Sequence, residues 1–462
     1  MKDTKRRFEA FSFFDHTGIQ AHLEEMAAKG WMVEQPGPYL WRYRRIEPQR
    51  LHFAVTYFPA ASEFDPGPTE GQQTYQDYCE SAGWHLSARW GQMQIFCTAE
   101  EDPVPLETDA LTQVDTVHRT MKRSSLPGMA VVAALALFQV CFQLRLFWED
   151  PVDFLSTPSS LYALPAWLVF LGVELYELLF YFRWYKRARA LAEATGEFLP
   201  IRTHRRLSLL LLAVAFLFFL SAALDHARST LFAMLFWLAA FVLILLLINA
   251  AKSALKGLQA PRAVTRAVTV IMSVVLAAAL TGGMTALIFR GIRSGWLEDR
   301  RPAETYEYRG MAWKVYADDI PLRIEDLTDT DYTRWSTEAR ISETVLAAFR
   351  EYTQRPRMDA LGEPDLAYDI VEVKVPFLYG ICKKSMLERY WFNDPAEYRS
   401  AYRPTDAAPW GAAEAYQLYH FQDKPSARYL LCWPDRIVEI RFDETPTAEQ
   451  MALAGEILKT AD

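Results

Sequence analysis

The sequence predicts an integral membrane protein in which about five transmembrane helices separate two soluble domains. Five apolar stretches of about 20 residues lie between positions 127 and 289, and a helix of that length crosses a hydrocarbon core of ~30 Å. The charge follows the same division, since segments 1–120, 121–290 and 291–462 carry net charges of −7, +8 and −9. Lys and Arg therefore concentrate around the apolar stretches, as anionic lipid favours.

The loops between the apolar stretches predict their orientation. We place the helices at about 127–148, 161–184, 207–224, 231–250 and 268–289. Cytoplasmic loops carry an excess of Lys and Arg, and the segment before the first helix and the loops after the second and fourth are basic. The amino terminus is therefore predicted to be cytoplasmic and segment 291–462 external. Four arginines after the fifth helix favour the opposite orientation: Arg290, Arg293, Arg300 and Arg301. The three basic segments outweigh them with fourteen Lys and Arg.

Few polar side chains interrupt the predicted spans. Gln139 and Gln143 are four residues apart on the first helix, and Glu174 and Glu177 are three apart on the second. A carboxylate near mid-bilayer is costly and marks a functional site by default. Alternatively, Glu174 hydrogen-bonds to Gln139 or Gln143 and pins the two helices together. We favour pinning, because the other three helices offer no charged counterpart.

The amino-terminal segment, 1–120, contains one local pattern twice. HLEEMAAKGWMVEQ and YQDYCESAGWHLSA both read as a helix, Gly-Trp and a strand. Gly after a helix is a common left-handed stop, and Trp at the start of a strand is a large core side chain. With a strand at 7–14 and strand pairs after each Gly-Trp, the pattern predicts helices on one face of an antiparallel sheet, a ferredoxin-like α/β domain.

These residues also carry a family resemblance. The opening FSFFDHTGIQAHLEEMAAKGWMVE, the later YCESAGWHL and the membrane helices that follow resemble a bacterial family of uncharacterised membrane proteins, known as domain of unknown function 2812. The resemblance covers about residues 7–115. Family members are often encoded beside winged-helix repressors of the PadR type, which implies a regulated envelope or stress function. The family has no assigned catalytic residues, so the resemblance implies none here.

Segment 291–462 predicts a separate α+β domain. Strand-like stretches lie near 305–316, 367–376, 414–421, 427–433 and 436–442, and helices near 337–354, 384–392 and 448–460. Thr447 and Gln450 form a capping box for the last helix. Trp433 to Arg436 reads as a hairpin turn.

The sequence offers no recognisable catalytic, cofactor or metal site. It contains no HExxH, paired CxxC, GxSxG, P-loop or GxGxxG motif. One acidic run lacks the spacing of a calcium loop and is better read as loop and helix-capping residues: Glu325, Asp326, Asp329 and Asp331. We therefore expect no enzyme, cofactor or metal.

Five cysteines divide between the predicted compartments. Cys79, Cys97 and Cys141 fall in cytosolic or membrane segments, where thiols stay reduced. Cys382 and Cys432 are the two in the domain predicted to be external, where a disulfide persists. A pair of buried thiols is the alternative.

These observations favour a non-enzymatic, multi-pass protein of the cell membrane with a signalling or regulatory role. Its cytosolic domain would bind a protein partner or ligand, and the helices would couple it to the external domain. Nucleic-acid binding is excluded because both soluble segments are acidic. The alternative is a transporter, or a transporter accessory subunit, that uses Glu174 and Glu177. A cleft with converging titratable groups in the external domain would favour an enzyme instead.

Overall fold

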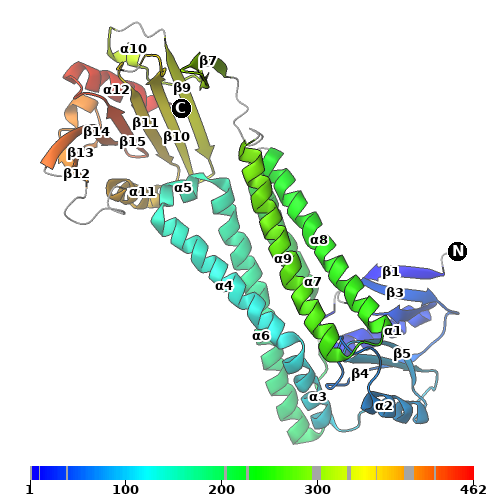
Figure 1. The fold of residues 1–462 in the computed structure, drawn as a ribbon. Coiled ribbons are helices and arrows are strands. Elements are labelled where there is room, and N and C mark those ends of the chain that lie inside the picture. Colours follow the sequence, from blue (N-terminus) through cyan, green and yellow to red (C-terminus); the bar gives the residue numbers. More distant parts are fainter. Residues whose placement is uncertain are drawn as a thin grey trace. The chain divides into compact units, whose positions relative to one another are not determined.

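The computed structural model describes most of the chain. The described residues are 3–9, 11–37, 40–201, 205–224, 228–293, 303–329, 334–360, 362–389, 400–420 and 423–461. The chain divides into two compact units (Figure 1). The first comprises Met1–Gln139, Ala166–Leu217 and Ala227–Arg293, and the second Val140–Pro165, Phe218–His226 and Ser294–Asp462. Three residues that entered the sequence analysis, Arg300, Arg301 and Asp331, lie outside the described residues.

The amino-terminal domain is built from two small antiparallel sheets and two helices. Its elements are β1 (Thr4–Phe8), α1 (His16–Ala28), β2 (Trp31–Gln35), β3 (Leu40–Arg45), β4 (His52–Tyr57), α2 (Glu70–Ser81), β5 (His85–Trp90) and β6 (Met93–Thr98). The strand orders are β1-β3-β2 and β4-β6-β5. A small sheet-rich domain is therefore present, and its described strands form two separate sheets, so the ferredoxin-like prediction is not confirmed. The strand predicted at 7–14 ends at Phe8.

The repeated helix-Gly-Trp-strand pattern is confirmed. Gly30 and Gly83 end α1 and α2 with φ of +80° and +83°, a conformation that glycine adopts without strain. A Cβ atom at Gly30 would lie 2.9 Å from the carbonyl oxygen of Ile46, so the site also excludes side chains. Trp84 is buried as expected, but Trp31 is half-buried.

Seven helices follow the sheets (Figure 1). They are α3 (Ala110–Arg123), α4 (Ser125–Glu149), α5 (Pro151–Ser156), α6 (Pro158–Thr195), α7 (Arg205–Leu224), α8 (Arg228–Gly257) and α9 (Arg262–Arg293). Within the described residues, α4, α6 and segment Arg262–Gly283 of α9 are long and apolar enough to cross a membrane. The apolar stretch Leu207–Phe218 of α7 is shorter. In the predicted span 231–250, the side chains of 231–238 and 241 lie outside the description.

The second half of α6 belongs to the core of the amino-terminal domain. Tyr181, Trp184 and Ala188 are buried at 0–5% exposure in one cluster with residues of α1 and of the strands. The indole nitrogen of Trp184 donates to the carbonyl oxygen of Leu199 at 3.2 Å. Both aromatic side chains therefore pack against protein.

The carboxy-terminal domain is organised around one antiparallel sheet of seven strands. In sheet order these are β12 (Ala401–Thr405), β13 (Glu414–His420), β14 (Lys424–Cys432), β15 (Arg436–Phe442), β11 (Leu366–Val373), β10 (Ala347–Pro356) and β9 (Trp335–Glu343). The remaining elements are the hairpin β7 (Glu304–Tyr308) and β8 (Met311–Val315), α10 (Ile324–Leu327), α11 (Pro376–Glu388), the 3-10 turn η2 (Ala408–Trp410) and α12 (Ala448–Thr460).

One predicted helix in this domain is wrong. Segment 337–354 forms β9 and β10, which pair antiparallel with Glu338 opposite Thr353. Its Ala, Glu and Arg residues favour a helix locally. Burial between neighbouring strands overrides that preference, because Tyr352 and Gln354 alternate into the core. The capping box of Thr447 and Gln450 is confirmed, as is the hairpin turn that joins β14 to β15.

Each face of the large sheet is covered differently (Figure 1). Tyr368, Val438 and Ile440 pack on one face with residues of α10, η2 and α12. Val371, Val373 and Ile437 pack on the other with residues of α11 and of the short helix α5.

Helix α5, which joins α4 to α6, is an integral part of this domain. Its residues Phe154 and Leu155 are 4% and 3% exposed. Thr344 donates its hydroxyl to the carbonyl oxygen of Leu155 at 2.5 Å, and Ser342 donates to that of Ser156 at 2.9 Å. The loop between the first two predicted spans is therefore a packed element of the carboxy-terminal domain.

Candidate binding pocket of the amino-terminal domain

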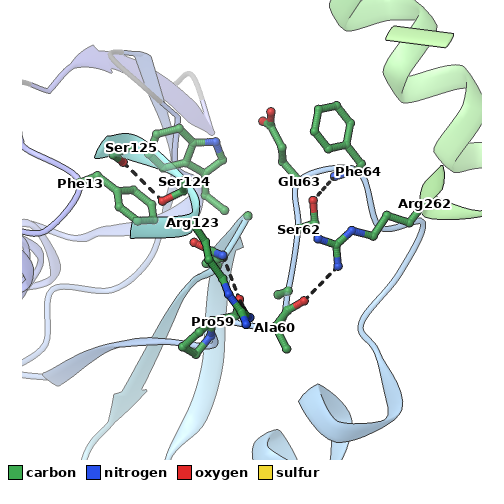
Figure 2. Close-up of a pocket in the computed structure, with 14 residues that line it drawn as sticks. Phe13, Pro59, Ala60, Ser62, Glu63, Phe64, Arg123, Ser124, Ser125 and Arg262 are labelled. Carbon is green, nitrogen blue, oxygen red and sulfur yellow. Dashed lines mark hydrogen bonds between the residues drawn. The ribbon is translucent and has the colours of Figure 1, made fainter. Parts of the chain in front are cut away.

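A pocket of about 680 Å³ lies where the amino-terminal domain meets its helices (Figure 2). One part of its wall is the loop 59–64 that follows β4, together with Phe13 and the β5–β6 turn, Trp90–Gln92. The rest is the junction of α3 and α4, residues 123–125, and Arg262 at the start of α9. The pocket thus joins the domain to two of the helices that are long and apolar enough to cross a membrane.

Backbone hydrogen bonds hold the loop wall in place. The amide of Phe58 donates to the carbonyl oxygen of Gln92 at 2.8 Å, and the amide of Ala61 donates to that of Phe58 at 3.0 Å. The side chain of Gln92 donates through Nε2 to the carbonyl oxygen of Pro59 at 3.1 Å. Its Oε1 atom is buried and accepts no hydrogen bond from the described residues. The pocket therefore has a fixed wall with one unused acceptor.

Two arginines reach this loop from the helices (Figure 2). Arg123, the last residue of α3, donates through Nη1 to the carbonyl oxygen of Pro59 at 3.3 Å. Arg262, the first residue of α9, donates to that of Ala60 at 3.2 Å, and its Nε atom is 3.8 Å from Asp65. Guanidinium groups hydrogen-bond more strongly to anions than to neutral carbonyl groups. Both arginines therefore retain the capacity to bind an anion in the pocket.

Positive charge is in excess around the pocket. Lys252 of α8 pairs with Glu63 at 3.1 Å. Burial, and then the charge of Lys252, lower the pKa of Lys256 one turn further along. Arg123, Arg262, Lys252 and Lys256 thus outnumber the nearby carboxylates of Glu63 and Asp65. An anionic ligand would complete this balance.

The predicted intramembrane glutamates line a neighbouring hollow of about 290 Å³. Glu174 and Glu177 share it with segment 11–14, Met121, and the α4 residues Ser125, Met129 and Val132. They are thus set beside the amino-terminal domain and the beginning of α4. Gln143 is 8% exposed, and its Oε1 atom accepts no hydrogen bond from the described residues. Gln139 is half-buried, and its pairing with Glu174 stays a prediction.

The other predicted candidates have structural surroundings. Cys382 and Cys432 are free thiols in one buried cluster, where burial raises the pKa of each to about 11. Their disulfide stays a prediction. In the acidic run, Asp326 accepts from the amide of Arg323 at 2.8 Å, and Glu325 accepts from Gln354 at 2.8 Å. No group of three or more His, Cys, Asp or Glu within the described ranges is arranged to hold a metal.

The fold is a sheet-rich domain attached to apolar helices, with a pocket at their junction. Residues 15–128 match the family described as Protein of unknown function (DUF2812), which confirms the resemblance for this part of the chain. The match includes most of the pocket wall and excludes Phe13 and Arg262. No curated protein and no solved structure matches the chain.

Proposed function

We propose that this chain is a non-enzymatic membrane protein with a signalling or regulatory role, and that a small amphipathic anion binds in its amino-terminal pocket. One observation carries the proposal: the pocket is lined at once by the domain loop 59–64 and by the first residues of α4 and α9. A ligand that contacts the loop and both helices stabilises the conformation of these three segments to which it binds best. Binding would therefore bias the helices as well as the domain.

The lining indicates the ligand class. Phe13, Phe64 and Trp90 provide apolar surface, and Arg123 and Arg262 provide the donors. Sites for small molecules combine a mostly apolar wall with a few convergent polar groups, and typically enclose several hundred Å³. An apolar body with one phosphate or carboxylate group fits this description. We expect a cytoplasmic protein partner of the domain to read the bound state.

The proposed topology is multi-pass, with five spans, a cytoplasmic amino terminus and an external carboxy-terminal domain. The packing at the two ends of α4 supports it. Leu126 and Met129, at its beginning, pack on the amino-terminal core. Helix α5, which follows its end, is buried in the carboxy-terminal core. If α4 crosses the bilayer, the two cores belong to opposite sides, as an odd number of spans requires.

Cysteine labelling tests this topology. In a background without the native cysteines, a cysteine introduced at Thr445 should react with an impermeant maleimide in intact cells. One introduced at Thr69 should react only after the cells are opened. Equal protection of both positions would contradict the odd number of spans.

Site-specific protection tests the ligand. A cysteine placed at Ser62, on the pocket wall (Figure 2), should be labelled several-fold more slowly in the presence of octyl phosphate. Octyltrimethylammonium, with the same chain and the opposite charge, should not protect it. Arg262→Gln should abolish the protection. Arg266→Gln should retain it, because Arg266 is exposed one turn further along α9 and does not line the pocket. Equal protection by both amphiphiles, or by neither, contradicts the proposed ligand class.

Two further measurements extend this test. Repeating it in nanodiscs of phosphatidylglycerol and of phosphatidylcholine distinguishes an anionic lipid headgroup from a free anion. If the domains are coupled, octyl phosphate should also change hydrogen exchange in α5. Unchanged exchange there would remove the coupling from the proposal and leave binding alone.

A transporter is the second candidate, and the hollow shared by Glu174 and Glu177 favours it. We expect Glu174→Gln to fold. If the protein is not a transporter, proteoliposomes of the unmodified protein and of this variant should both show the same proton flux as protein-free vesicles. Glu174→Leu should weaken helix packing by about 1–2 kcal/mol. A proton flux in the unmodified protein that Glu174→Gln abolishes and Glu177→Gln retains would favour transport over signalling.

A further inference from the structure

One half of a face of the large sheet carries charged side chains. The same face that packs on α11 and α5 continues along the strands into Glu351, Thr353 and Arg355 of β10, which alternate outward. Asp369 of β11 lies directly opposite Glu351, and Glu439 of β15 lies directly opposite Asp369. Three neighbouring strands therefore present carboxylates in one row.

Two adjoining hollows of about 180 and 270 Å³ lie over these strands. Both are lined by Glu351, Thr353 and Arg355. Ala367, opposite Thr353, also lines the smaller one. The small side chains of Thr353 and Ala367 leave room between longer neighbours, and this difference in size creates the hollow.

Carboxylates define one end of the site. Glu439 accepts hydrogen bonds from Tyr402 at 2.9 Å, Arg389 at 3.0 Å and Arg428 at 3.2 Å. Asp369 accepts from Arg389 at 2.9 Å. Burial still raises the pKa of Asp369 to about 6, against the effect of Arg389 and with that of Glu439. The two carboxylates share Arg389, and Glu439 also bonds to Arg428, so Asp369 is the less compensated of the two.

Arginines define the other end, and two polar groups there are unused. Arg355 is exposed and has neither a hydrogen bond nor an ion pair with any described residue. Arg441 bonds to Asp365 at 2.5 Å. Thr353, between the two ends, is 8% exposed, and its hydroxyl has no partner among the residues that the structure describes. The Thr353 hydroxyl is thus open to the hollow and available to bond to a ligand.

We propose that this hollow binds a short zwitterion. Its ammonium group would lie toward Glu351 and Asp369, its carboxylate would lie toward Arg355 and Arg441, and the hydroxyl of Thr353 would bond between them. The carboxylates of Glu351 and Asp369 lie in one row across the strands, with Arg340 3.9 Å from Glu351, and Arg355 and Arg441 lie beyond Thr353. A ligand with one charge would engage only one of these two rows.

The spacing of the charged groups sets the length of the ligand. Glu351 and Arg355 are four residues apart on one strand, which separates their Cα atoms by about 14 Å. Side chains that lean together shorten this gap, but the two charges of the ligand must still be several bonds apart. An ω-amino acid or a dipeptide meets both ends, whereas an α-amino acid meets one.

Converging titratable groups also suggest an enzyme, and the geometry favours binding instead. Glu439 accepts hydrogen bonds from Tyr402, Arg389 and Arg428, which hold it as a structural anion. The residues that line the two hollows include neither His nor Cys. The charged side chains that line the hollows can therefore all contribute to binding a charged ligand, whereas few of them could act as a catalytic base or nucleophile.

Calorimetric titration of the full-length protein in detergent tests the proposal. Glycine, γ-aminobutyrate, glycylglycine and ε-aminocaproate form a series of increasing charge separation, and butyrate and butylammonium carry one charge each. We expect a member longer than glycine to bind at least about tenfold more tightly than glycine and than both single-charge compounds. Absence of binding throughout the series at millimolar concentrations, or equal affinity for butyrate, would overturn the proposal.

Three variants assign the binding to this site. Arg355→Gln and Thr353→Val should each weaken the preferred ligand by about tenfold. Lys459→Gln, a loss of one exposed charge on α12, should leave the affinity unchanged. Thermal unfolding should be the same for Arg355→Gln and Lys459→Gln, because both side chains are exposed. Equal weakening by these two variants would also overturn the assignment.

Discussion

A buried carboxyl group in the amino-terminal domain makes its stability depend on pH. Glu107 lies in the segment between β6 and α3, where Leu106 packs on the cluster around Cys79 and Trp84. The indole nitrogen of Trp84 donates to the carbonyl oxygen of Val104 at 2.8 Å, which holds the segment against the domain. Burial raises the pKa of Glu107 to about 7. No cation or hydrogen-bond donor among the described residues offsets this effect.

The sign of the pH dependence follows from this shift. The ordinary pKa of a glutamate is 4.5, so between about pH 4.5 and about pH 7 the folded domain binds more protons than the unfolded chain. Its free energy of unfolding therefore falls as pH rises through this window. The shift has an upper limit of about 3.4 kcal/mol at 1.36 kcal/mol per pKa unit. Because the side chain retains partial contact with water, we expect about 1–3 kcal/mol.

Glu107→Gln removes the charge and keeps the shape. At about pH 8 the variant should be more stable by about 1–3 kcal/mol, and near about pH 4, below the ordinary pKa, the difference should almost vanish. Hydrogen exchange of peptides from α2 and β6, with variant and unmodified protein compared at each pH, reads the local opening free energy of this domain. Glu101→Gln, an exposed glutamate in the same segment, is the control. A gain that is independent of pH, or equal in the control, would refute the reasoning.

Two further predictions concern the carboxy-terminal domain. A Cβ atom at Gly455 would lie 2.0 Å from the carbonyl oxygen of Trp410, so Gly455→Ala should displace α12 and cost about 3 kcal/mol or more. At Gly380 on α11, an added Cβ atom would have no neighbour within 4 Å, so Gly380→Ala should instead stabilise the domain by about 0.5–1 kcal/mol. Hydrogen exchange of α11 and α12 measures the effects of the two substitutions. Cys382 and Cys432, as buried thiols, should resist maleimide in the folded protein and react after unfolding without reductant. Failure to react after unfolding would identify a disulfide.

Local patterns in the sequence predicted those elements whose cause is local. Gly30 and Gly83 end helices because glycine alone adopts positive φ freely, and the Thr447 capping box is complete within four residues. Segment 337–354 was predicted wrongly because its composition favours a helix, while its conformation depends on β11 and on the core beneath it. The helix α5 also escaped prediction, since six residues between two apolar stretches carry no periodic signal.

The candidate sites were less predictable than the fold. Arg123 and Arg262 were recognised only as basic residues near membrane segments, and their contacts with Pro59 and Ala60 join distant parts of the chain. Loop 59–64 contains no motif that would mark a pocket. The zwitterion site depends on strand register, which sets Glu351 opposite Asp369. A one-residue slip would turn every one of these side chains to the other face.

Helix α4 is the element best suited to connect the two domains. Ser125, at its first turn, lines the proposed ligand pocket, and the chain continues from its last residue, Glu149, directly into the buried helix α5. A helix of 25 residues is about 37 Å long. Under the proposed function, these two packed flanking segments would let α4 transmit a displacement that a loose loop would absorb. The transporter alternative would instead use polar groups of the spans, among them Gln139 and Gln143 of α4.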